Sequence, residues 1–369
     1  MLSAVRLHTS LRVFTSCTTP AHRGLMGKWK THLSHIFICI LITMAVFLIC
    51  FSSNWNWAWW NTLDHNAGPK EHNRSSPGQQ APRTPWKDSW LYYVAYPGDY
   101  KFVMDDTDVC KVEAPFLVLM VPVAPADVAA RDAIRKTWGN ETLVQGKLVQ
   151  TLFLLGVPGG ADAQQQQQNL KQENLLHHDL IQSNFQDSYR NLTIKTMVML
   201  EWLTAHCLSA SYVMKIDSDM LLNVQNLVNL LLDPNTPKQN YMTGLVWWHS
   251  PVLRNPEDKF YMPKEVFDKP EYPPYPLGMS YVMSRDLPGK ILGVSPQIKP
   301  IFIEDAYLGM CLKHLGISPT DPPEKSMFIV NPKHSLNRCS LSKVIAVTTE
   351  NIPQMMSYWE MIREPGAAC

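Results

Sequence analysis

The sequence lacks an excess of either charge, and this bears on the class of partner. Its 33 lysines and arginines almost balance 32 aspartates and glutamates, which leaves a formal net charge of +1 at pH 7. A protein that binds nucleic acid usually carries an excess of basic residues that neutralises phosphates. The composition therefore argues against nucleic acid as a partner.

The eight cysteines include no C-x-x-C pair, so the spacing typical of zinc sites and of thioredoxin-type redox sites is missing. Five of them follow the apolar segment near the N-terminus: Cys110, Cys207, Cys311, Cys339 and Cys369. In an oxidising compartment disulfides are the expected state of such residues. Because five is odd, one thiol is expected to stay free, or to pair with Cys50 or with another chain.

Acidic residues are absent from residues 1–34, which carry five basic ones. The near-continuous apolar run that follows is just long enough, with its flanking tryptophans, to span a bilayer. The basic end is expected to stay cytoplasmic, and the tryptophans to lie in the opposite interface. The predicted segments are a cytoplasmic tail over 1–34, a transmembrane signal anchor over 35–52 and a lumenal stem over 53–110.

Two alternatives compete with the signal anchor. Translation from Met26 would leave an n-region short enough for a cleavable signal peptide, and the acid-free start over 1–16 resembles a mitochondrial transit peptide. The long n-region and the lack of an obvious small-residue cleavage site favour the anchor.

From residue 114 onward, apolar strands alternate with amphipathic helices, without an internal repeat. Phe116–Val123 predicts a buried strand and Asp127–Trp138 a helix. Apolar residues at 224, 227, 228 and 231 define one buried helix face. This alternation predicts an α/β domain over 111–369, with an open sheet that binds ligands at its strand carboxyl ends.

Two carboxylates, Asp217 and Asp219, stand one residue apart where the apolar run over 212–216 ends. On one turn both could reach a small hard cation such as Mg²⁺ or Mn²⁺, which would also hold a diphosphate. An isolated pair of this kind is more often a solvated turn, so its setting decides the interpretation.

That setting is a set of sequence blocks in a fixed order over residues 110–369. They read SYVMKIDSDMLLN around the two aspartates, with RDAIRKTWGNE and YRNLTIKT before them, then YPPYPLG, EDAYLGMCL and a closing W…C. The ordered set resembles the β-1,3-glycosyltransferase family, and most closely its β-1,3-galactosyltransferase branch. The resemblance implies a GT-A-like fold, a Rossmann-like open mixed sheet flanked by helices.

The resemblance also implies roles at the centre of the domain. Asp217, Ser218 and Asp219 would lie against the UDP-galactose donor, with Asp219 the direct ligand of Mn²⁺ or Mg²⁺ and Asp217 near the ribose or a metal-bound water. Asp305 would be the general base. An aspartate just ahead of a helix is also what an N-cap looks like, and the positive helix end would keep its carboxylate ionised.

Other blocks carry weaker expectations. Arg131, Arg135 and Trp138 are expected to form part of the nucleotide pocket, although two arginines at i and i+4 are commonly a solvated helix face. Lys215 would meet phosphate or be an edge lysine, and the sequence leaves this open. The predicted donor and acceptor wall, for which core packing is an equal alternative, consists of Tyr272, Tyr275, Gly278, Tyr281 and Glu304.

The chain departs from the family pattern at several positions. Pro276, Leu277 and Ser280 replace the usual cysteine, serine and second glycine of the wall, which puts donor and acceptor identity in question. Where relatives have F-N-H-W, this chain reads VNPKH, so His334 is expected to be a surface histidine rather than a metal ligand. Three N-x-[ST] sequons are candidate glycosylation sites, at Asn73, Asn140 and Asn191.

With the predicted anchor, the resemblance implies a Golgi type II membrane protein that transfers galactose to the 3-hydroxyl of a terminal N-acetylglucosamine-type acceptor on a glycoprotein or glycolipid. Asp305 would deprotonate this hydroxyl for an inverting displacement. One alternative is transfer of N-acetylglucosamine, since Tyr281-Val282-Met283-Ser284 resembles F-V-M-S of the sister branch. Another is a catalytically silent glycan-binding homologue. The oligomeric state is left open, with a homo-oligomer as one outcome.

Overall fold

The computed structural model describes Tyr96, residues 100–105, 107–111 and 113–366, and Cys369. All of these lie in one compact unit, Ala81–Cys369. The predicted tail and signal anchor and the sequon at Asn73 lie outside the described residues, so they stay predictions. Among the residues that are described, no helix is long and apolar enough to cross a membrane.

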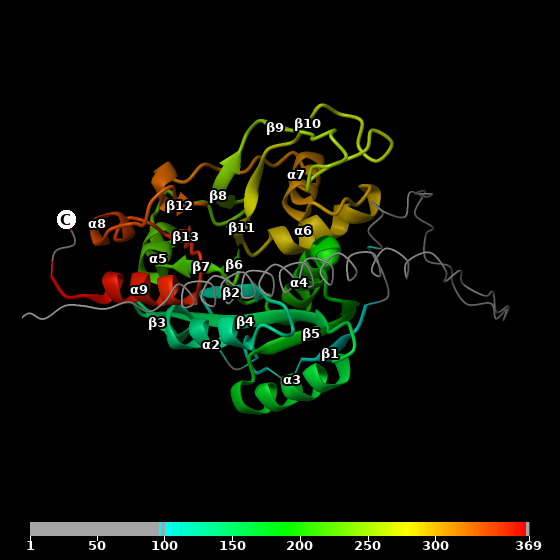
Figure 1. The fold of residues 1–369 in the computed structure, drawn as a ribbon. Helices are drawn as coiled ribbons and strands as arrows, with labels where there is room; N and C mark the ends of the chain where they lie inside the picture. Colours follow the sequence, from blue (N-terminus) through cyan, green and yellow to red (C-terminus); the bar gives the residue numbers. More distant parts are fainter. Residues whose placement is uncertain (1–95, 97–99, 106, 112, 367–368) are drawn as a thin grey trace, which may run out of the picture. The chain divides into compact units, whose positions relative to one another are not determined.

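The centre of this unit is an eight-stranded mixed sheet with the order β1-β5-β4-β2-β6-β11-β8, in which β3 pairs with β4 (Figure 1). β5, β4, β2 and β6 run parallel, β11 runs antiparallel to β6, and β8 antiparallel to β11. The strands are Phe102–Met104 (β1), Leu117–Pro122 (β2), Leu143–Val144 (β3), Lys147–Val157 (β4), Leu180–Gln186 (β5), Tyr212–Ile216 (β6), Met242–Trp247 (β8) and Tyr275–Ser284 (β11). The predicted open mixed sheet is confirmed.

Helices cover both faces of this sheet, because alternate residues of its central strands point to opposite sides. In β2, Val118 and Met120 enter one apolar cluster with α4, α6 and α7, while Leu117 and Leu119 enter another with α2, α5 and α9. The helices are Val128–Lys136 (α2), Ala163–His177 (α3), Leu192–His206 (α4), Val224–Leu232 (α5), Leu287–Val294 (α6), Glu304–His314 (α7), Arg338–Leu341 (α8) and Ile352–Arg363 (α9).

Two smaller sheets complete the unit. β12 (Phe328–Ile329), β13 (Ala346–Thr348) and β7 (Met220–Leu222) form a three-stranded sheet that begins directly after Asp219. β9 (Ser250–Pro251) and β10 (Glu271–Tyr272) pair within the long proline-rich segment, and β10 contacts α7. β13, from the C-terminal part of the chain, therefore pairs with β7, the strand that directly follows the two aspartates.

Disulfides join Cys110 to Cys207 and Cys339 to Cys369. Cys311 remains a free thiol inside α7 and is fully buried. The odd cysteine count thus reflects one free thiol, as one of the sequence alternatives held.

Candidate functional site

The turn that follows β6 presents Asp217 and Asp219 at the carboxyl edge of the sheet. The backbone N–H of Asp217 donates to the carbonyl of Met279 on β11 at 2.9 Å. Beyond the turn, the N–H and hydroxyl of Thr349 both donate to the carbonyl of Asp219, at 2.8 and 2.9 Å. The backbone is thereby held from two sides, while Asp219 is exposed and Asp217 and Ser218 are half-buried.

A buried lysine joins this turn to α7. The Nζ of Lys215 lies 2.7 Å from Oδ1 of Asp217 and 3.3 Å from Oε1 of Glu304, and it also donates to the carbonyl of Gly278. Burial disfavours the charged ammonium, but the two carboxylates outweigh it and raise the pKa of Lys215 above its usual value. Lys215 is thus a charged core residue that fixes β6, β11 and α7 to one another, not an edge lysine.

Glu304, the first residue of α7, points into this cluster. Its Oε2 accepts from the hydroxyls of Thr196 at 3.2 Å and Tyr281 at 3.4 Å. Its Oε1 has the ion pair with Lys215 but no aligned hydrogen-bond donor among the described residues. Burial raises the pKa of Glu304 to about 7, and Lys215 opposes this shift. The carboxylate of Glu304 is thus enclosed by protein groups, and its contact with substrate stays a prediction.

Asp305 is half-buried beside Glu304 and accepts two backbone hydrogen bonds. Its Oδ2 accepts from the N–H of Gly278 and its Oδ1 from the N–H of Ala306, each at 2.8 Å. Burial raises the pKa of this carboxyl, while the two N–H donors and Lys215 oppose the rise. Since α7 begins at Glu304 with Ile303 as its N-cap, Asp305 lies inside the first turn rather than at the predicted cap position.

Gly278 connects the two halves of the site. Its carbonyl accepts from Lys215 and its N–H donates to Asp305, so one residue links the metal-site turn to the candidate base. A Cβ at this position would lie 2.6 Å from Oε1 of Glu304 and 3.3 Å from Oδ2 of Asp305. The predicted substrate-wall glycine is thus needed for the close approach of two carboxylates.

Gly278→Ala is expected to displace these carboxylates, lowering the free energy of unfolding by about 1–3 kcal/mol as overpacked substitutions do. The transfer rate should fall with it, because the candidate base would move. Urea unfolding and initial rates measure the two effects. Gly293→Ala in α6 is the control, because nothing lies within 4 Å of the added methyl. Equal behaviour of the two variants would contradict the assigned role of Gly278.

The first turns of α4 bind the start of α7 and the segment just before it. These residues belong to the YRNLTIKT block, for which the sequence pattern indicated no role in the site. Thr193 donates to the carbonyl of Ile301 at 2.6 Å, just ahead of α7. Lys195 donates to the carbonyl of Val123 at 2.9 Å and pairs with Asp187 at 2.8 Å. Polar residues in an otherwise apolar helix could have indicated this role, because a buried threonine or lysine side chain needs a hydrogen-bond or charge partner.

The two arginines of α2 do not join this cluster, and their contact with the nucleotide stays a prediction. Arg131 is fully buried and forms a bidentate pair with Glu173 on α3, at 2.6 and 2.7 Å. Arg135 pairs with Glu173 and with Asp179, and their charges raise its pKa despite the cost of burial. With their donors engaged by protein carboxylates, both guanidinium groups fasten α2 to α3 and β5.

The aromatic residues expected at the site are buried, which favours the core-packing alternative. The indole N–H of Trp138 donates to the carbonyl of Met220 at 3.0 Å and so fixes β7 instead of lining a nucleotide pocket. Tyr281 is fully buried, and Tyr275 shares a hydrogen bond of 2.8 Å with Ser250. Tyr272 is also buried, and its hydroxyl has no partner among the described residues. Their ring faces are not open to a sugar.

The remaining candidate residues lie at the surface or near it. His334 is exposed, as expected of a surface histidine. The side chain of Asn140 is also exposed, whereas Asn191 is half-buried and donates to the carbonyl of Gln186 at 2.8 Å. Asn140 is therefore the more accessible of these two sequons.

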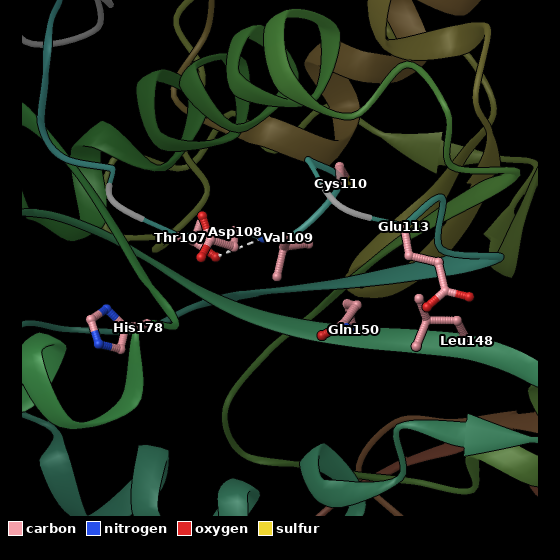
Figure 2. A pocket seen from close by; sticks show the side chains of 8 residues that line it. All are labelled: Thr107, Asp108, Val109, Cys110, Glu113, Leu148, Gln150 and His178. Carbon is pink, nitrogen blue, oxygen red and sulfur yellow. Dashed lines mark hydrogen bonds between the residues drawn. The ribbon is translucent and has the colours of Figure 1, made fainter.

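A hollow of about 650 Å³ has none of Asp217, Asp219, Glu304 or Asp305 in its lining. Figure 2 shows the side chains that line it. Leu148 and Gln150 at the start of β4 and His178 just before β5 line it, together with the segment around the Cys110 disulfide. It therefore opens at the amino ends of the parallel strands. Ligands of open α/β sheets bind at the opposite edge, which carries Asp217 and Asp219.

The donor set at the turn fits a divalent cation. Asp219 has no ion-pair partner among the described residues. Although the residue reaches solvent, partial desolvation of its carboxyl and then the charge of Asp217 raise its pKa. A cation would relieve that repulsion. The described residues contain no group of three or more candidate metal-ligating side chains. Mg²⁺ is commonly held by one or two carboxylates while substrate phosphates and water supply the other ligands, so Mg²⁺ or Mn²⁺ stays a prediction for this turn.

Comparison with known proteins was informative at the level of family. Residues 129–323 match the family model described as galactosyltransferase. The chain is 36% identical to human beta-1,3-galactosyltransferase 2 over 275 residues, covering 73% of this chain and 64% of that protein. It is 36% identical to mouse beta-1,3-galactosyltransferase 1 over 264 residues, covering 71% of this chain and 78% of that protein.

A relative with a different donor in its name is similarly close. Human UDP-GalNAc:beta-1,3-N-acetylgalactosaminyltransferase 1 is 34% identical over 278 residues, which cover 74% of this chain and 83% of that protein. Among solved structures, a WbbM bifunctional glycosyltransferase matches with a TM-score of 0.39 and 11% identity, covering 69% of this chain and 51% of that one. On the strength of the family model and the sequence relatives, the chain belongs to the galactosyltransferase family.

Proposed function

We propose that this protein is an inverting β-1,3-glycosyltransferase with a GT-A-like fold that transfers galactose from UDP-galactose to the 3-hydroxyl of a terminal N-acetylglucosamine-type acceptor. The observation that carries the proposal is the connected site, in which Gly278 and Lys215 link the Asp217 turn to Asp305. Two disulfides favour an oxidising compartment. We therefore keep the Golgi lumen and a type II anchor in the proposal.

In this mechanism Asp217 and Asp219 would hold Mn²⁺ or Mg²⁺, which supplies charge neutralisation for the departing diphosphate. Asp305 accepts the proton of the acceptor 3-hydroxyl as the oxygen attacks the anomeric carbon. The two backbone N–H groups on Asp305 fix the orientation of its carboxylate. A single displacement inverts the anomeric configuration, so an α-linked donor yields a β product.

The donor sugar needs its own experiment, because one relative at 34% identity is named for UDP-GalNAc instead of UDP-galactose. The deciding experiment offers purified full-length protein and Mn²⁺ three donors in parallel: UDP-galactose, UDP-N-acetylgalactosamine and UDP-N-acetylglucosamine. We expect the fastest transfer to a GlcNAc-terminated acceptor from UDP-galactose. Faster transfer of another sugar would reassign the donor, and no transfer by folded protein would favour a glycan-binding homologue.

The pH dependence of transfer is expected to report on Asp305. Its pKa is raised from the ordinary value of 3.8 mainly by burial, and a general base works only when deprotonated. The rate should therefore fall, as pH decreases, at a pH clearly above 3.8. Measuring kcat/KM from about pH 3 to about pH 8, a range that extends below the ordinary aspartate pKa, checks this. A rate that stays constant down to an ordinary aspartate pKa would contradict it.

A further inference from the structure

Four large apolar side chains are exposed in the stretch of chain that runs from the last residue of β8 toward β10. They are Trp247, Trp248, Leu253 and Phe260, with exposed fractions of 45, 40, 37 and 42%. Figure 1 shows this part of the chain, with β8, β9 and β10, beside α7, whose first turn carries Asp305. A large apolar side chain exposed near a site is a candidate for ligand contact when it also has a structural link to that site.

Trp247 is the member of this group most closely tied to the site. It ends β8 opposite Tyr275 on β11, and the two rings lie 6.3 Å apart between centroids. Tyr275 in turn packs against α7, since a Cβ on Gly309 would lie 2.9 Å from its Cβ. Burial, with a smaller contribution from the charge of Asp305, raises the pKa of Tyr275 to about 12.

The neighbouring indole is held differently. The Nε1 of Trp248 lies 3.0 Å from both carboxylate oxygens of Asp321, so its donor is engaged. The Nε1 of Trp247 has no acceptor among the described residues, and nearly half of the side chain faces solvent. Trp247 therefore offers both a ring face and a free N–H, whereas Tyr272, Tyr275 and Tyr281 are covered.

The position of Trp247 favours the acceptor over the donor. Donor phosphates belong at the turn after β6, and β11 separates β6 from β8. Gly278, three residues along β11 from Tyr275, fixes the carboxylate of Asp305 that receives the acceptor proton. An acceptor that places its hydroxyl at Asp305 can continue toward β8 without crossing the donor site.

We propose that Trp247 is a stacking platform for a sugar ring of the acceptor glycan, bound next to the ring that Asp305 deprotonates. This inference rests on the proposed transferase function. The apolar C–H face of a pyranose packs on an indole, and the indole N–H donates to a sugar hydroxyl. Trp247 would then select acceptors of two or more sugars over a single GlcNAc.

The test compares full-length wild-type protein with Trp247→Ala, Trp247→Phe and the control Leu176→Ala, an exposed apolar residue on α3 with no assigned role. Loss of an aromatic contact worth about 0.5–1.5 kcal/mol should raise the acceptor KM of Trp247→Ala by roughly 2- to 13-fold. The kcat at saturating acceptor and the KM for UDP-galactose should stay unchanged. Trp247→Phe should keep most of the affinity, and Leu176→Ala should resemble wild type.

Equilibrium binding of a GlcNAc-terminated oligosaccharide without donor, followed by ligand-observed NMR, separates this inference from the proposed function. Wild-type transfer with an unchanged acceptor KM in Trp247→Ala would overturn the role of Trp247 and leave the transferase standing. Absence of transfer, with oligosaccharide binding that Trp247→Ala loses, would remove the transferase and retain the platform. No binding by wild type would overturn the platform.

Discussion

Asp305→Asn is expected to lower the transfer rate by about 10²–10⁴-fold, the usual contribution of a positioned general base. The amide cannot accept the proton of the acceptor hydroxyl. It also fits its pocket poorly, because the N–H groups of Gly278 and Ala306 each donate to one carboxylate oxygen. An asparagine can satisfy only one of them, so we expect an additional stability cost of about 1 kcal/mol. Initial rates at saturating donor and acceptor measure the first effect, and urea unfolding the second.

Asp127→Asn is the matched control for this substitution. Asp127 also accepts a backbone hydrogen bond at the start of a helix, from Ala130 at 3.2 Å, but it belongs to α2 and takes no part in the Lys215 cluster. Its variant should transfer sugar at the wild-type rate. Binding of UDP in the presence of Mn²⁺ should also be unchanged in Asp305→Asn, since the change lies on the acceptor side. Retention of about a tenth of the rate or more would show that another group accepts the proton.

Local sequence patterns were sufficient for the framework of this site. The unbroken apolar run of β2 predicts a strand buried on both faces, and the structure places it at the centre of the sheet. The apolar face of α5 is likewise buried at Val224, Leu227, Val228 and Leu231. The two aspartates lie at a strand end as expected, because an apolar run followed by carboxylates marks the point where the chain leaves the core.

The ionic partners within the protein could not be predicted from local sequence, because they come from distant parts of the chain. Arg131 pairs with Glu173, 42 positions later, and no pattern around Arg131 indicates that partner. Lys215 is undecided from local sequence because its second carboxylate, Glu304, belongs to a helix that begins only after β11. Three tyrosines were compatible with either packing or sugar binding, and burial decided between the two. The exposure of Trp247 could not be predicted, because the hydrophobic pattern of a strand does not show whether its last residue is covered.

Lys215→Met is expected to destabilise the fold by about 3–5 kcal/mol, because it removes one partner of a buried ion pair. Both Lys215 and Glu304 are almost fully buried, at 5 and 7% exposure, so solvent screens their interaction little. The variant leaves Glu304 with hydroxyl donors on Oε2 alone. Urea unfolding measures the loss. Lys290→Met, which breaks an i,i+4 pair with Asp286 at 2.7 Å and 40% lysine exposure, should cost under about 1 kcal/mol.

The double variant Lys215→Met with Glu304→Gln tests whether charge pairing is the source of this loss. Replacing both members of a buried pair by neutral groups of similar volume is often close to neutral. The double variant should therefore recover most of the stability that Lys215→Met loses. It should not recover transfer, because Asp217 and the Gly278 carbonyl still lack the ammonium that holds them. If the double variant is no more stable than Lys215→Met, the lysine acts through packing of its aliphatic chain. If it transfers at the wild-type rate, the link between the metal-site turn and Asp305 has no part in catalysis.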